Sequence, residues 1–81
     1  MDDLKGSIRD YILEEFLPGE NPSALTDTTP LITGGVLDSL ATVKLVAHLE
    51  ERYGVVVEAH EMTADYLDTV DSIAQLVQSK K

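Results

Sequence analysis

All three prolines of this 81-residue chain lie in one stretch, residues 17–37, which also holds three of its five glycines. Proline lacks the backbone N–H that a helix needs and glycine weakens helices, so this stretch predicts a connection between helices. A connection of this length is uncommon in a small domain and is often functional. We expect an ordered loop, pinned across the core by five apolar residues: Leu25, Leu31, Ile32, Val36 and Leu37.

The segment before this connection has the apolar spacing of one helix face. It predicts a helix over about residues 3–16, with these residues on its apolar side: Leu4, Ile8, Tyr11, Ile12 and Phe16. Asp2 and Asp3 place negative charge at its N-terminus, and Pro18 with Gly19 marks its end.

The longest helical pattern follows the connection and predicts a helix over residues 39–53, with Gly54 as its stop. One stripe of this helix suits the core: Thr42, Leu45, Val46, Leu49 and Tyr53. A second stripe begins beside Ser39 with i, i+3, i+7 spacing: Leu40, Val43 and Ala47. The second stripe has two interpretations. Either the helix has a wide buried face, or an apolar strip is exposed next to a functional serine and edged by Lys44, Glu50 and Glu51.

The remaining sequence predicts shorter elements. The stretch GVVVE, residues 54–58, is locally strand-like, but no second strand is available to pair with it, so we expect an extended connection whose valines fill the core. A short helix is expected over residues 60–66 and a last helix over residues 70–79, with Thr69 as its N-cap and Lys80 and Lys81 at its C-terminal end. The inward positions of the last helix are Val70, Ile73, Ala74 and Val77. The predicted fold class is all-α, a small three- to four-helix bundle.

Length and composition limit the kind of protein. Residues 1–81 suffice for one domain, and the absence of cysteine excludes a disulfide framework or a thiolate metal site. The first residues lack the order of a signal peptide, and no apolar run reaches membrane-spanning length, so we expect a cytoplasmic protein without a membrane span.

The charge is strongly negative, with a formal value of −9. Between Asp10 and Ser79 the only Lys or Arg residues are Lys44 and Arg52. Such a surface repels phosphate backbones, so we expect no nucleic acid partner, and it attracts a basic patch on another protein. The alternative is that the acidic surface only keeps a small protein in solution.

Catalysis by the side chains themselves is poorly supported. A nucleophilic Ser39 needs a base within hydrogen-bond reach, but His48 lies more than two turns along the same predicted helix and His60 has no partner that its spacing predicts. The hydrolase pattern Gly-x-Ser-x-Gly is absent, and neither histidine has a metal-ligand spacing. We therefore expect no enzyme, no catalytic residue and no metal.

The dipeptide Asp38-Ser39 has two interpretations of its own. Aspartate is a preferred N-cap, so the pair could do no more than begin the helix. A capped helix N-terminus also favours a phosphate group, because free N–H groups and the helix dipole attract negative charge. Under the second interpretation a phosphodiester on Ser39 is well accommodated.

The six residues from Gly35 to Leu40, GVLDSL, resemble the Gly-x-x-Asp-Ser-Leu attachment motif of acyl and peptidyl carrier proteins. The serine of that motif carries 4′-phosphopantetheine. The resemblance extends over nearly the whole chain, through TPLITGG, DSLATVKLVAHLEERYGV and DTVDSIAQLV. It implies the helical bundle of the acyl carrier type, with a long loop between its first two helices.

The resemblance also implies roles for individual residues. Ser39 is the expected attachment site, and Asp38 the expected cap and recognition residue for the phosphopantetheinyl transferase. The positions that meet partner enzymes are Leu40, Val43, Ala47, Glu50 and Glu51. Lys44, also counted among the partner-binding positions, is a departure, because carriers of fatty acid synthesis usually have an acidic residue there.

Within the family, GGVLDSL and YLDTVDSIAQLV are most similar to freestanding aminoacyl or D-alanyl-type carriers. This implies a monomer that holds acyl or aminoacyl thioesters, is loaded by a separate adenylating ligase and then meets acyltransferases, condensing or tailoring enzymes. Two alternatives stay open: an acyl carrier of fatty acid or polyketide synthesis, and an acidic helical interaction module without a prosthetic group. The identity of the cargo is not encoded in any motif.

Overall fold

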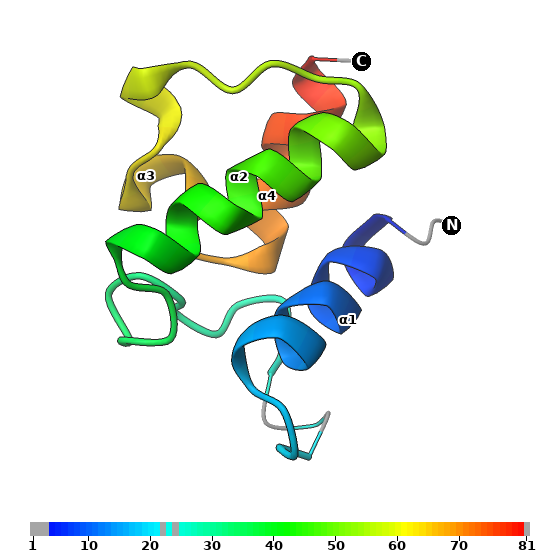
Figure 1. The fold of residues 1–81 in the computed structure, drawn as a ribbon, viewed down its shortest axis with the longest axis vertical. Helices are drawn as coiled ribbons and strands as arrows, with labels where there is room; N and C mark the ends of the chain where they lie inside the picture. Colours follow the sequence, from blue (N-terminus) through cyan, green and yellow to red (C-terminus); the bar gives the residue numbers. More distant parts are fainter. Residues whose placement is uncertain (1–3, 22, 24, 81) are drawn as a thin grey trace.

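The computed structural model describes residues 4–21, 23 and 25–80, and within these ranges it contains helices and no strand. The helices are α1 (Leu4–Phe16), α2 (Ser39–Tyr53), the 3₁₀ helix η2 (Ala59–Glu61), α3 (Ala64–Leu67) and α4 (Val70–Ser79). Helix α4 contacts both α1 and α3, and the start of α2 lies on the same side of the molecule as α3 (Figure 1). The prediction of an all-α bundle of the acyl carrier type is confirmed.

Local signals begin and end the longer helices where the sequence places them. The Thr69 hydroxyl accepts a hydrogen bond from the backbone N–H of Ser72 at 3.0 Å, which caps α4. Gly54 ends α2 in the left-handed conformation, at φ 69°, and its N–H bonds to the carbonyl of Glu50. Asp2 and Asp3, expected at the start of the first helix, lie outside the described residues, as does Lys81.

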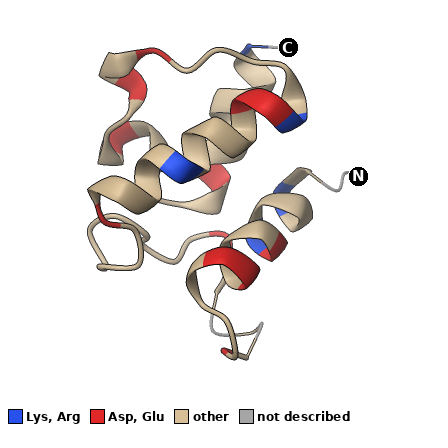
Figure 2. Cartoon of the chain, viewed as in Figure 1, with Lys and Arg blue, Asp and Glu red and all other residues tan. Residues whose placement is uncertain are grey.

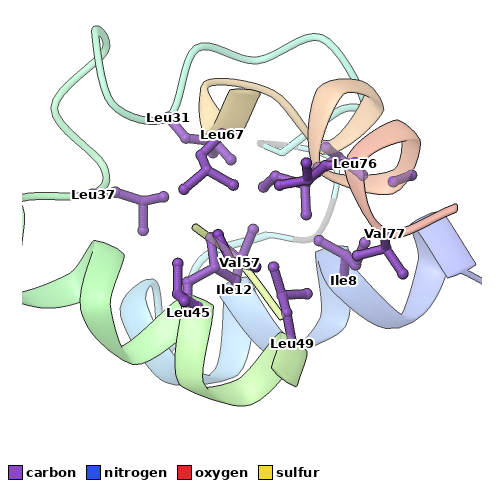
Figure 3. Packing of buried hydrophobic residues seen from close by; sticks show 14 of the residues in the cluster. Ile8, Ile12, Leu31, Leu37, Leu45, Leu49, Val57, Leu67, Leu76 and Val77 are labelled. Carbon is purple, nitrogen blue, oxygen red and sulfur yellow. The ribbon is translucent and has the colours of Figure 1, made fainter. Parts of the chain in front are cut away.

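One hydrophobic cluster joins all the longer helices and the loop (Figure 3). Nine of its side chains are almost wholly shielded from solvent: Ile8, Ile12, Leu31, Leu45, Leu49, Leu67, Ile73, Val70 and Val77. Two further loop residues, Leu25 and Leu37, are each 3% exposed. The connection from Leu17 to Leu37 is therefore tied to the core by buried side chains, as its apolar residues predict.

Polar contacts join α1, α4 and the loop to one another. Arg9 pairs with Asp27, and the Lys5 ammonium lies 2.8 Å from a carboxylate oxygen of Asp71. The N–H of Asp71 also donates to the carbonyl of Asp27 at 3.0 Å. The middle of the loop is in this way fixed to both terminal helices.

The segment after α2 differs in two respects from the expectation. Val55 and Val57 are buried, but Val56 is 66% exposed, because successive side chains of an extended chain point to opposite sides. The single short helix expected over residues 60–66 is divided into η2 and α3, with Met62 and Thr63 between them.

Candidate functional site

Ser39 is the first residue of α2, and its side chain is exposed. Asp38 precedes it in an extended conformation, and its Oδ1 accepts a hydrogen bond from the N–H of Ala41 at 2.8 Å. The carbonyl of Asp38 accepts two more bonds, from the N–H and the hydroxyl of Thr42, at 2.9 and 2.8 Å. The predicted N-cap is confirmed, and it fixes the backbone on both sides of an accessible hydroxyl.

The two glycines before this helix start are required for different reasons. A Cβ on Gly34 would lie 2.3 Å from the carbonyl oxygen of Pro30, so no side chain fits there without a shift of the backbone. Gly35 has open space around it but a φ of +84°, which disfavours other residues. The loop can therefore turn tightly just before Ser39.

Asp68, at the junction of α3 and α4, holds this loop from the opposite side. Its Oδ1 accepts hydrogen bonds from the N–H groups of Ile32 and Thr33, at 2.8 and 2.9 Å, and its Oδ2 accepts one from the Thr33 hydroxyl at 2.9 Å. These donors, led by the Thr33 N–H, lower the pKa of Asp68. Sequence reasoning missed Asp68 as part of the site, because its partners are more than 30 residues away along the chain.

An open pocket of about 500 Å³ lies beside Ser39. Its walls come from three segments: the loop at Ile32 and Leu37, the first turns of α2 from Asp38 to Val43, and the stretch from Met62 to Ala64. The lining mixes apolar residues with Asp38 and three hydroxyl-bearing residues: Ser39, Thr42 and Thr63. A flexible chain attached at Ser39 could rest in this pocket or leave it.

The outward face of α2 carries the second apolar stripe. Leu40 is 68% exposed and Val43 is 52% exposed, and Ala47 is also exposed. The core stripe is buried by contrast, with Leu45 and Leu49 at 0%. Of the two interpretations, the exposed strip beside Ser39 is the one that agrees with the structure.

The charges along this face differ in accessibility. Lys44 and Glu51 are exposed, and Figure 2 shows a basic residue midway along α2 with acidic residues toward its end. Glu50 is half-buried, and its Oε2 accepts a hydrogen bond from the N–H of Val57 at 2.9 Å. The Glu50 carboxylate therefore secures the chain that follows α2 and is not a freely exposed charge.

Neither histidine takes part in a site with Ser39. The His48 ring stacks on Tyr11, with 3.7 Å between centroids and 5° between planes, and its burial lowers the pKa of His48. His60 meets Tyr66 edge to face. Among the described residues no group of three or more His, Cys, Asp or Glu is placed to hold a metal ion. In the same part of the chain no helix is long and apolar enough to cross a membrane.

Comparison with known proteins agrees with this geometry. The family model of the phosphopantetheine attachment site matches residues 12–77. A D-alanyl carrier protein of Streptococcus sanguinis is 34% identical over 73 residues, which cover 90% of this chain and 89% of the relative. A D-alanyl carrier protein of Streptococcus pyogenes is 38% identical over 74 residues, covering 89% of this chain and 92% of the relative.

Proposed function

The chain belongs to the family of phosphopantetheine-binding carrier proteins, and on this premise we propose that Ser39 bears the covalently attached 4′-phosphopantetheine arm. The observation that carries this proposal is the exposed hydroxyl on the first residue of α2, next to a capped helix start. Asp38 keeps the backbone in one conformation, so a transferase meets the serine in a fixed position. We propose that residues 1–81 form a single carrier domain.

The surroundings of Ser39 suit a phosphodiester. A helix N-terminus presents backbone N–H groups and a positive dipole end, and both favour a bound phosphate. The arm supplies a thiol on which an acyl or aminoacyl group is held as a thioester. The Asp38 carboxylate beside Ser39 is engaged as the helix cap, and neither histidine lines the pocket, so we propose a carrier that presents its cargo and is not itself an enzyme.

The exposed strip on α2 is the proposed contact surface for partner enzymes. Leu40 and Val43 supply apolar area, and Lys44 and Glu51 supply charges that can select a complementary surface. The partners we propose are a phosphopantetheinyl transferase, an adenylating ligase and a downstream acyltransferase, condensing or tailoring enzyme. A contact limited to one exposed helix face buries little area, so we propose that it is weak enough for a monomeric carrier to leave each enzyme in turn. Its location in the cytoplasm stays a prediction.

An aminoacyl group is the cargo that the comparisons favour. The relatives at 34 to 38% identity are D-alanyl carrier proteins, and they align over nearly their whole length. We propose D-alanine as the first cargo to test, loaded by a separate adenylating ligase. Lys44 favours a carrier outside fatty acid synthesis. It places a cation in the middle of the proposed contact strip, where carriers of fatty acid synthesis usually have an acidic residue.

Intact-mass measurement tests the attachment site. The protein is incubated with coenzyme A and a broad-specificity phosphopantetheinyl transferase, beside Ser39→Ala and the control Ser79→Ala, whose side chain is also exposed and lies at the end of α4. We expect a gain of one phosphopantetheine in the wild type and in the control, and none in Ser39→Ala. No gain in a folded wild-type protein would reject the carrier function and favour an interaction module.

A second step tests the cargo. The modified protein is incubated with ATP, D-alanine and the adenylating ligase that serves one of the D-alanyl carrier relatives. We expect a further mass gain of one alanyl group, lost on treatment with hydroxylamine because a thioester is cleaved by it. Modification at Ser39 without alanylation would keep the carrier function and remove D-alanine as the cargo.

A further inference from the structure

Asp68 connects the α3–α4 junction to the loop before Ser39 through four hydrogen bonds. Three go to its carboxylate, from Ile32 and Thr33, and the fourth joins the N–H of Leu31 to its carbonyl at 2.6 Å. Leu31 and Leu67 are both fully buried and lie close together in Figure 3. The loop is therefore held at this point by polar bonds on its surface and by apolar contact beneath.

The bonds continue from this point to the start of α2. The carbonyl of Leu31 accepts hydrogen bonds from the N–H groups of Val36 and Leu37, at 2.8 and 2.9 Å. Asp38 follows directly and caps the helix. A displacement of residues 31–33 is in this way passed to Ser39 through one carbonyl and two residues.

We propose that Asp68 is a positioning residue for Ser39, which acts by clamping the loop in the conformation that enzymes meet. The inference rests on the proposed attachment at Ser39. Asp68 does not line the pocket, but the residue that it holds, Ile32, forms part of the pocket wall. The clamp thus sets two features of the site together, the place of the serine and the width of the pocket beside it.

The clamp can be lost without loss of the fold. Leu31 and Leu37 stay buried by apolar contact, which keeps the loop attached to the core. The exposed turn between them, from Thr33 to Gly35, has its conformation fixed by hydrogen bonds and by the two glycines. Without the carboxylate the loop populates several conformations, and only a fraction of molecules present Ser39 correctly. The apparent affinity of a transferase for the carrier then falls by that fraction, while the rate of transfer within the complex is unchanged.

Four variants separate positioning from a general loss of stability. Asp68→Ala removes all three side-chain bonds, and Asp68→Asn keeps an oxygen for the N–H groups and offers an N–H to the Thr33 hydroxyl. Thr33→Val removes only the hydroxyl bond and decides the question if Asp68→Ala does not fold. Asp65→Ala is the control, because Asp65 is an exposed aspartate of α3. Each protein is measured by amide hydrogen exchange without any enzyme, and then by transferase kinetics with coenzyme A.

For Asp68→Ala we expect faster exchange at Thr33, Val36 and Leu37, unchanged exchange in α1 and α4, and a KM for the carrier raised about tenfold with kcat kept. For Thr33→Val the expected rise is about threefold, and Asp68→Asn and Asp65→Ala should stay within about twofold of the wild type. Wild-type exchange and kinetics in Asp68→Ala would overturn the inference, as would faster exchange spread over the whole of a folded Asp68→Ala protein. If the wild type itself is not modified, the proposed function fails. Unchanged exchange in Asp68→Ala would then separately reject the clamp.

Discussion

The Asp38 carboxylate accepts a hydrogen bond from the N–H of Ala41 at 2.8 Å, and Ser39 lies between the two residues. The same aspartate therefore begins the helix and precedes the proposed attachment site. Two effects of this residue need to be separated. One is its contribution to helix stability, and the other is the negative charge that it places beside the serine.

Removal of the Asp38 side chain should destabilise the fold by about 1 kcal/mol, which is typical for loss of an N-cap. Asp38→Asn should recover most of this free energy, because asparagine is an equally good cap. Urea unfolding of Asp38→Ala and Asp38→Asn measures both values. The rate of modification by the transferase then measures the effect of the charge alone. If Asp38→Asn has wild-type stability but is modified slowly, the transferase recognises the carboxylate. If it is modified at the wild-type rate, Asp38 acts only as a cap.

The exposed strip on α2 predicts opposite results for two valines three residues apart. Val43 is 52% exposed and Val46 is 6% exposed. Val43→Asp should leave the free energy of unfolding within about 0.5 kcal/mol of the wild type, while Val46→Asp should cost about 3 kcal/mol or more because it buries a charge.

Circular dichroism and urea unfolding test the stabilities, and transferase kinetics test the contact. Val43→Asp should raise the KM for the carrier because it places a charge in the apolar contact strip. A loss of helical content in Val43→Asp would assign this residue to the core, and an unchanged KM would remove it from the contact surface.

Glu50 and Glu51 are adjacent, but we expect their substitution to change different quantities. Glu50→Ala should lower the free energy of unfolding by about 1 kcal/mol, since the N–H of Val57 loses its acceptor. Glu51→Lys should keep stability and reduce the association rate with a basic partner about two- to fivefold at low salt. Stopped-flow association at two ionic strengths measures the second effect. If Glu51→Lys associates at the wild-type rate at both ionic strengths, Glu51 is excluded from the encounter surface.

Much of the fold follows from local signals in the sequence. The residues that begin and end α2, Asp38 and Gly54, act within one turn of the helix, so their types alone predict its bounds. The exposed strip is also readable, because the periodicity of α2 provides more apolar positions than a single buried face needs. What periodicity cannot decide is which stripe is buried, and that required the packed structure.

The parts that the sequence did not predict depend on contacts between distant segments. Asp68 meets Ile32 and Thr33 across more than 30 residues, and no local pattern marks an aspartate as a loop clamp. Glu50 is half-buried, and its carboxylate accepts a hydrogen bond from the N–H of Val57, in an extended segment that has no strand partner among the described residues. In both cases an acidic side chain satisfies backbone N–H groups that lack a helical partner.

His48 gives the last prediction, which concerns the dependence of stability on pH. Its ring stacks on Tyr11 and meets Tyr53 edge to face, and burial, followed by the nearby Arg52 charge, lowers the pKa of His48. A lowered pKa means that the folded state binds fewer protons than the unfolded state. The contribution of His48 is therefore complete above the unfolded pKa of about 6.5 and is lost as the pH falls below it.

Urea unfolding at pH 7.5 and at pH 5.5 tests this sign. The wild type should lose more stability between the two values than His48→Phe, which keeps an aromatic ring on Tyr11 without a titratable group. The difference should stay below about 1 kcal/mol, because part of the ring faces water. His60→Gln, altered at an exposed histidine, is the control and should behave as the wild type. An equal pH dependence in wild type and His48→Phe would show that the imidazolium is tolerated in the stack, which would place the cost of acidification on the carboxylates instead.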